Sequence, residues 1–161
     1  MQHTITFTQQ VKEEIASNTY ESKDRLRALL AAFIKINGTL TFKNKETILL
    51  AKTENAKIAK FIYSNLKEIY NADISFEYHQ KKSLKKKRVY HISVNTMSDE
   101  IIEDLEITFL EGKISKNIVR NDDTIAGYLA GAFLASGSIN SPKSSNYHLE
   151  ISLNNENYAK W

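Results

Sequence analysis

Apolar residues recur at helical spacing in four stretches of this 161-residue chain, and each stretch predicts a helix. These helices are expected over residues 8–17, 22–36, 53–71 and 98–106. In the first, Phe7, Val11 and Ile15 fall on one face, and Thr6 forms a capping box with Gln9. The second is expected to end at Asn37-Gly38 with a residue in the left-handed region, as helices often do.

Strand-like patterns lie between these helices. The segment 39–42 alternates polar and apolar residues and precedes an apolar run at 48–50. Residues 74–79 alternate again, and an apolar segment follows at 89–94. Two hairpins with polar turns are therefore predicted, and together they make a four-stranded antiparallel sheet. Helices would cover one face of this α+β unit and leave the other face free.

Charge and composition narrow the class of protein. The net charge is only +3, but it is segregated: residues 81–88 read KKSLKKKR, and acids gather over 99–111. A basic hairpin tip of this kind can reach phosphates, although a plain solvated turn has the same composition. The chain has no cysteine, which excludes disulfides, cysteine-based zinc sites and cysteine nucleophiles. No apolar stretch is long enough to span a bilayer, so a cytoplasmic, nucleoid-associated protein without a cofactor is expected.

Residues 127–139 repeat the sequence pattern of residues 28–40, 99 positions later in the chain. In both, a helix of small and apolar residues ends at a glycine and leads into a strand. Gly127, Gly131 and Ala135 are four residues apart, so one face of the later helix is nearly bare and another helix can approach closely. The residues expected to pack at this helix seam are Ala28, Ala31, Ala32, Gly127, Ala130, Gly131 and Ala135.

The segments LAAFIKING (30–38) and LAGAFLASG (129–137) resemble degenerate copies of the LAGLIDADG motif of homing endonucleases. In that family two motif helices pack at a pseudo-two-fold axis, each opening an αββαββα half, and two antiparallel sheets form a saddle over duplex DNA. The stretches FTQQVKEEI, IAKFIYSNLKEIY, KKSLKKKRVY and GAFLASGSINSPKSSNYHLEI make the chain most similar to the WhiA family. This resemblance implies a bacterial DNA-binding regulator linked to sporulation, cell division and chromosome segregation.

The nuclease carboxylates are replaced. In the endonucleases an acid just before the final glycine of each motif holds divalent metal, and the matching positions here are Asn37 and Ser136. Neither side chain is anionic at neutral pH, so no catalytic residue and no metal site are expected. Asp122 and Asp123 are interpreted as residues that cap the second motif helix and complement its dipole. His79 and His91 can face each other across a hairpin, but no further metal ligand joins them.

Candidate DNA contacts come from the two hairpins. At the basic tip they are Lys81, Lys82, Lys85, Lys86, Lys87 and Arg88, and at the first tip they are Lys43 and Lys45. On the sheet face, Thr39, Thr41 and His79 are placed to reach base edges or phosphates. A plain solvent face would show the same alternation, and a one-residue slip in register would change the set.

Three segments are expected: an N-terminal helical arm at 1–21, a first LAGLIDADG half at 22–121, and the start of a second half at 122–161. The second half lacks its second hairpin and a helix-turn-helix domain. It is therefore interpreted as part of a longer protein, or as a half completed by self-association. The leading hypothesis is a non-catalytic domain that binds double-stranded DNA. The alternatives are an endonuclease with residual metal-dependent activity and a scaffold that docks a transcription-machinery protein.

Overall fold

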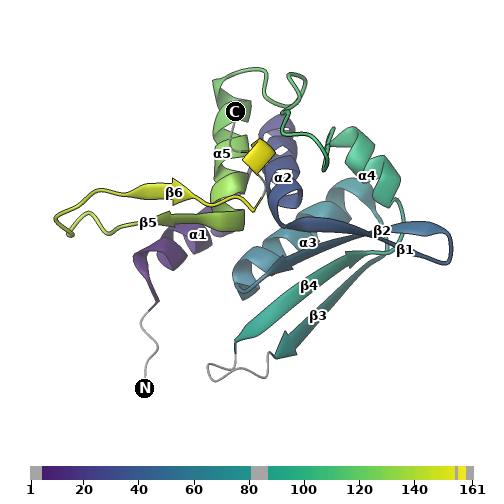
Figure 1. Cartoon of the computed structure of the whole chain (residues 1–161), viewed down its shortest axis with the longest axis horizontal. Helices are drawn as coiled ribbons and strands as arrows, with labels where there is room; N and C mark the ends of the chain where they lie inside the picture. Colours follow the sequence, from purple (N-terminus) through teal and green to yellow (C-terminus); the bar gives the residue numbers. More distant parts are fainter. Residues whose placement is uncertain (1–4, 81–86, 155, 159–161) are drawn as a thin grey trace.

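The computed structural model describes residues 5–80, 87–154 and 156–158. The expected four-stranded antiparallel sheet is present, in the order β1-β2-β4-β3. Its strands are β1 (Gly38–Lys43), β2 (Glu46–Thr53), β3 (Ile74–Gln80) and β4 (Arg88–Val94). The α+β prediction is confirmed, and the two hairpins join through β2 and β4 (Figure 1).

The described parts of the chain contain five α-helices. They are α1 (Phe7–Ser17), α2 (Lys23–Asn37), α3 (Ala56–Tyr70), α4 (Ser98–Asp104) and α5 (Asp122–Ser136). The predicted capping box of α1 is formed, since Thr6 Oγ1 accepts from the Gln9 amide and the Gln9 side chain accepts from Thr6 N. Helix α3 begins at Asn55, whose side chain accepts from the amides of Lys57 and Ile58.

The end of α2 differs from the prediction. Gly38 has φ −87° and ψ 150°, so the chain leaves the helix in an extended conformation and not through the left-handed region. Glycine is needed there for space, because a Cβ would lie 2.3 Å from the carbonyl oxygen of Ile34. Gly137 repeats this at the end of α5, where a Cβ would lie 2.1 Å from the Phe133 ring. Each glycine therefore lets a helix run directly into a strand.

The turn of the first hairpin is tight. Lys43 pairs with Glu46, which leaves Asn44 and Lys45 as a two-residue loop with φ of 53° and 67°. Positive φ at both positions matches the twist of the strands, but it is a strained conformation for lysine. Lys45 is exposed at this tip.

Register divides the sheet into a covered face and an open face. Buried Leu49 pairs with Leu40 and with Val94, so these residues lie on the face that packs against the helices. The alternate positions form the open face of the sheet. They include Thr39, Thr41, Lys43, Lys52, Ser75, Glu77, His79, His91 and Ser93.

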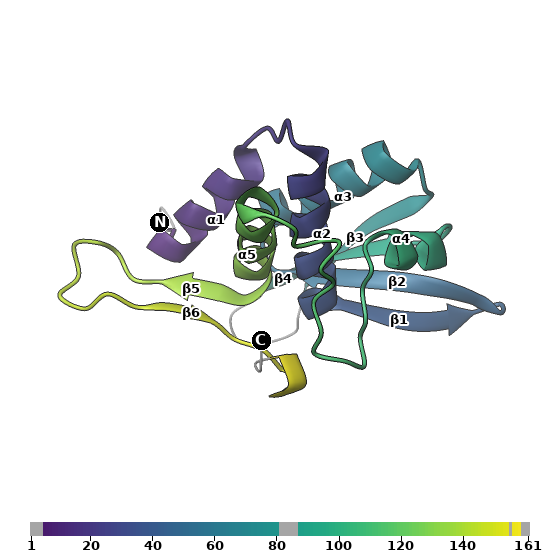
Figure 2. The same cartoon turned by 90° about the horizontal axis from the view of Figure 1, so that it is seen from above.

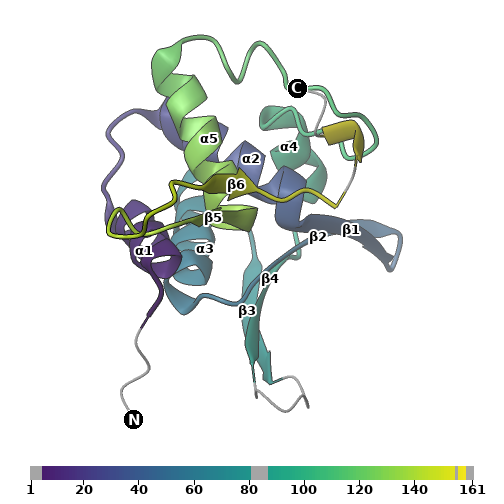
Figure 3. The same cartoon turned by 60° about the vertical axis from the view of Figure 1, so that its left-hand side comes forward.

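A second, smaller unit follows α5. The two-stranded sheet of β5 (Gly137–Ile139) and β6 (Leu149–Ile151) leads to a short 3-10 helix, η1 (Glu156–Tyr158). The β5-β6 hairpin and the β1-β2 hairpin point in opposite directions from the α2 and α5 pair (Figure 2). Helix α1 lies beside α3 and beneath β5 (Figure 3), and Thr8 Oγ1 exchanges hydrogen bonds with the backbone of Ile139.

The core lies between α2, α3, α4 and the covered face of the sheet. Helix α2 supplies its centre, with Leu29, Leu30, Phe33 and Ile34 fully buried. This wide apolar face explains why α2 packs simultaneously against the sheet and against α5. Among the described residues, no helix combines the length and apolar character needed to cross a membrane.

Candidate nucleic-acid interface

The two motif helices, α2 and α5, pack side by side with their backbones in close contact. A Cβ added at Gly127 would lie 2.4 Å from the Arg25 carbonyl oxygen, and one at Gly131 would lie 2.0 Å from that of Leu29. Of the other residues expected at the seam, Ala28, Ala31 and Ala32 are buried, and Ala130 and Ala135 are half-buried. The seam therefore leaves no room for a side chain at either glycine.

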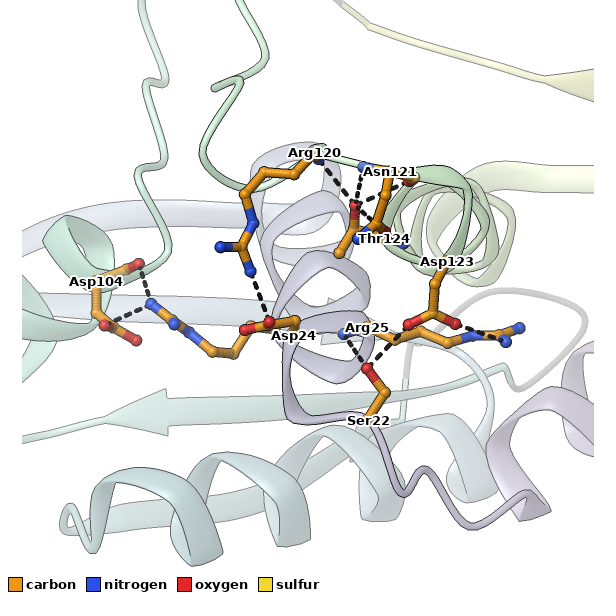
Figure 4. Close-up of polar contacts among 9 residues, drawn as sticks. Ser22, Asp24, Arg25, Asp104, Arg120, Asn121, Asp123 and Thr124 are labelled. Carbon is orange, nitrogen blue, oxygen red and sulfur yellow. Dashed lines mark hydrogen bonds and ion pairs between the residues drawn. The ribbon is translucent and has the colours of Figure 1, made fainter.

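Ionic and capping contacts join the N-terminal ends of α2 and α5 (Figure 4). Asp123 on α5 accepts from Ser22 Oγ at 2.9 Å and pairs with Arg25 at 3.4 Å. In return, Asp24 on α2 pairs with Arg120, just before α5. Each aspartate thus reaches across to the beginning of the other helix.

The N-caps at this end also correspond. Ser22 caps α2, and Asn121 caps α5 through a capping box with Thr124. Asp123 therefore has a structural role in the N-terminal contacts of the seam. A third ion pair lies further out, where Arg27 donates to Asp104 at the end of α4 with an N–O distance of 2.6 Å.

The C-terminal end of the seam carries the positions where the endonucleases have acids. Asn37 Nδ2 donates to the carbonyl oxygens of Lys52 at 3.2 Å and Ala135 at 3.1 Å, and so ties α2 to both β2 and α5. Ser136 Oγ is buried and has no hydrogen-bond partner among the described residues. Both side chains are neutral, so the seam presents no carboxylate at this end.

The open face of the sheet brings together the candidate contacts Thr39, Thr41, Lys43 and His79. All four are exposed. The same face also carries Glu77, which lies 3.6 Å from His79 Nε2. The same register also places Glu46 and the apolar residues Ile48, Leu50 and Val89 on this face, so the face is mixed in polarity and in charge.

Arg88 is not brought to this face. It pairs with Gln80 on the covered side of the sheet, and its guanidinium lies 5.7 Å from the Tyr78 ring centroid. Lys87 instead pairs with Glu54, with 3.6 Å between Nζ and Oε2. The other candidates of the basic tip, Lys81, Lys82, Lys85 and Lys86, lie outside the described residues.

Two histidines meet on the open face. The rings of His79 and His91 have centroids 4.5 Å apart, although the direct register partner of His91 is Glu77. Burial lowers the pKa of His91, and nearby His79 and Lys52 lower it further. Within the described parts of the chain, no group of three acidic or histidine side chains is arranged to hold a metal ion.

Sequence reasoning missed a cleft beside the C-terminal end of the seam. It has a volume of about 560 Å³, and its lining includes Asn37, Thr39, Lys52, Glu54 and Lys12. Lys12 comes from α1, and its Nζ lies 5.7 Å from the ring centroid of Phe133 on α5. The sequence placed Lys12 on the polar side of an amphipathic helix and gave no sign that α1 would bring it here.

Lys35 is a second lysine whose role the sequence did not indicate, and it binds the segment that connects the two motif helices. Lys35 on α2 is only 7% exposed, and its Nζ donates to the carbonyl oxygens of Glu111 at 2.9 Å and Lys113 at 2.7 Å. Burial lowers the pKa of Lys35, and Glu111 partly opposes this. Lys35 therefore holds the segment that follows α4 against the seam.

Family models match both parts of the chain. The model described as the WhiA N-terminal LAGLIDADG-like domain matches residues 23–108, and the model described as the WhiA LAGLIDADG-like domain matches residues 125–161. The first match covers the four-stranded sheet with its helices, and the second covers α5 and all that follows.

Curated relatives carry the same family name. The chain is 38% identical over 150 residues to the probable cell division protein WhiA of Enterococcus faecalis, covering 91% of this chain and 48% of the relative. The Staphylococcus aureus protein of that name is 33% identical over 159 residues, covering 97% of this chain and 50% of the relative. The chain thus spans about half the length of the curated relatives it matches.

Solved structures agree with this fold. The crystal structure of "full-length DUF199/WhiA from Thermatoga maritima" superposes with a TM-score of 0.62 at 24% identity, covering 92% of this chain and 45% of that one. The N-terminal LAGLIDADG domain of DUF199/WhiA gives a TM-score of 0.61 at 25% identity, covering 94% of this chain and 68% of that one.

Proposed function

Because this chain belongs to the WhiA family and has its LAGLIDADG-like fold, we propose that it is a non-catalytic domain that binds double-stranded DNA. The relatives are named probable cell division proteins. We infer that the domain serves a transcription regulator that acts in cell division and sporulation, at the nucleoid in the cytoplasm.

One observation carries this proposal. The open face of the sheet and the C-terminal end of the seam border one cleft, where Asn37 donates its amide to two carbonyl groups. An amide that is used in this way ties the helices together and offers no anionic oxygen to Mg²⁺. The arrangement supports binding a duplex without cutting it.

Phosphate contacts would come first from the hairpins. Lys43 and Lys45 stand at the tip of β1-β2, and Lys87 stands where β4 begins. All three are exposed. Thr39 and Thr41 lie between them and the seam, where hydroxyl groups can reach phosphates or base edges.

The test is a titration of labelled duplex DNA at rising salt with Mg²⁺ present, followed by electrophoresis of the DNA. The wild-type chain should bind with a steep salt dependence and leave the DNA intact. Replacing Lys43, Lys45 and Lys87 together by alanine should make the slope of log K against log salt less steep, by about 0.9 for each phosphate that the variant no longer neutralises.

The matched control replaces three exposed lysines away from the open face, Lys60, Lys67 and Lys116, with the same change in net charge. It should keep the wild-type slope. Equal reductions in both triple variants would reduce the effect to net charge alone, and metal-dependent cleavage would establish a nuclease instead.

A second candidate function is docking of a protein from the transcription machinery. It is favoured by Phe42, which is 79% exposed near the β1-β2 tip, and by Glu77 on the open face, where DNA would meet negative charge. Phe42→Ser should weaken capture of such a protein and leave duplex binding unchanged.

A further inference from the structure

The cleft beside the C-terminal end of the seam is built from four helices and the sheet. Its lining comes from the start of α1, the ends of α2 and α5, the start of α3 and the open-face side of β2 and β4. At about 560 Å³ it is large enough for a phosphate group with its flanking sugar atoms. Much of its lining is polar, including Gln9, Asn37 and Asn55.

Lys12 is held in this cleft by the fold and not by an opposite charge. It is half-buried and stands over the Phe133 ring, and burial lowers the pKa of Lys12 with no carboxylate of the described residues to offset it. The adjacent acid on α1, Glu13, is engaged elsewhere: it pairs with Lys57 at 3.1 Å and accepts from Asn55 at 3.3 Å. Burying a cation without a partner costs free energy.

The other charges of the cleft leave it positive among the described residues. Lys52 lines it from β2 and has an exposed side chain. The acid in the lining, Glu54, is paired with Lys87. Two lysines and one carboxylate leave the lining with a net positive charge, and Asn37 at the seam is neutral.

We propose that this cleft is an oxyanion site, with Lys12 as its main ligand and Lys52 as its second, and that it takes a backbone phosphate of the bound duplex. The identity of the ligand rests on the proposed DNA binding. The site lies where the open face meets the seam, so a phosphate held there would fix the duplex at the centre of the surface. Lys12 then anchors the N-terminal helix to the DNA.

Two variants of equal charge test the DNA side. Lys12→Gln should make the slope of log K against log salt less steep by about 0.9, as expected when one phosphate is no longer neutralised. Lys60→Gln removes an exposed lysine from α3, on the helix side of the sheet, and should leave the slope unchanged. A Lys12→Gln variant that binds duplex DNA with the wild-type slope would overturn the site as a DNA contact.

An NMR experiment tests the site without DNA. The side-chain carbon signals of Lys12 and Lys60 are followed against pH in inorganic phosphate and in chloride of equal ionic strength. Bound phosphate stabilises the ammonium form, so the pKa of Lys12 should be higher in phosphate than in chloride, with no such difference at Lys60. Identical curves for Lys12 in both salts would overturn the oxyanion site.

The two arms separate the proposals. If the wild-type chain binds no duplex and yet phosphate raises the pKa of Lys12, the DNA function fails and an oxyanion site remains. If duplex binding is normal while both Lys12 tests are negative, the function stands and the site fails.

Discussion

The two ends of the α2/α5 seam differ in how their charged groups are paired. At the N-terminal end Asp24 pairs with Arg120, and Asp123 meets Ser22 and Arg25. Among the described residues, Ser136 Oγ at the C-terminal end is buried without a partner, as are the Nε atoms of Arg25 and Arg27 toward the other end, and no carboxylate offsets the burial of Lys12. A cleft opens beside this second end.

The difference separates residues that hold the fold from residues available to a ligand. Asp24 and Asp123 contact groups at the start of the other helix, so they serve the packing of the two helices. Unpaired polar groups beside a cleft cost stability, and proteins retain such groups where binding repays the cost. The C-terminal end is thus the place to look for binding, and the following variants test this contrast.

The largest effect should come from the packing that both ends share. In Gly131→Ala the new Cβ would lie 2.0 Å from the Leu29 carbonyl oxygen, so the helices must separate. We expect a decrease of about 3 kcal/mol in the free energy of unfolding, typical of overpacking. Urea denaturation measures it, with Leu129→Ala, at an exposed site of α5, as the control that should change little. A Gly131→Ala protein as stable as wild type would show that the helices have room to move apart.

The next largest effect tests the C-terminal end of the seam. Asn37→Asp removes an amide that donates to two carbonyl groups and sets a carboxylate against them. Stability should fall by about 2 kcal/mol, the cost of unsatisfied and repelling polar groups. Millimolar Mg²⁺ or Ca²⁺ should restore part of this stability, because a cation can bridge the oxygens.

Asn37→Ala is the matched control for this variant, since it removes the same two hydrogen bonds without adding charge. It should be destabilised with no response to divalent cations. If chelator and Mg²⁺ give the same stability for Asn37→Asp, the end of the seam is not a place where a cation can be held.

A smaller effect is expected at the N-terminal end of the seam. Asp24→Asn and Asp123→Asn each remove an ion pair that is about half exposed to solvent. Each should cost about 0.5 kcal/mol, and the cost should shrink at high salt because solvent screens such pairs. Thermal denaturation in low and high salt measures this. Duplex binding should remain at the wild-type level, and a clear decrease would assign these aspartates a role beyond the fold.

Local features of both halves follow from the sequence. Ser22 caps α2, as a small polar residue before an apolar helix is expected to do, whereas α5 is capped by Asn121 and not by Asp122 or Asp123. The spacing of Gly127 and Gly131 likewise indicates a bare helix face, and the structure packs that face on the backbone of α2. These features depend on neighbours in the chain, which is why pattern alone identifies them.

Features that depend on distant segments could not be predicted. The pairing of β2 with β4 joins two hairpins, and nothing in either hairpin specifies which edges meet. Lys12 enters the cleft because Thr8 binds the backbone of Ile139, 131 residues away. In the sequence Lys35 is a single charged residue within an apolar stretch, which does not indicate a partner. Its carbonyl partners lie in a segment with no regular structure.

The smallest effect concerns the pH dependence of stability at the C-terminal end of the seam. Burial lowers the pKa of Lys12 in the folded chain, so its charged form opposes folding while it is protonated. This penalty is fully present below the folded pKa and disappears as the pH rises to the ordinary lysine value. Lys12→Met should therefore be slightly more stable than wild type at pH 7, and this gain should vanish near pH 10.5. Urea denaturation of both proteins across this range measures it, with exposed Lys60→Met as the control whose difference from wild type should not depend on pH. A Lys12→Met variant that is less stable than wild type at pH 7 would make Lys12 a supporting residue of the fold, and both ends of the seam would then serve the fold.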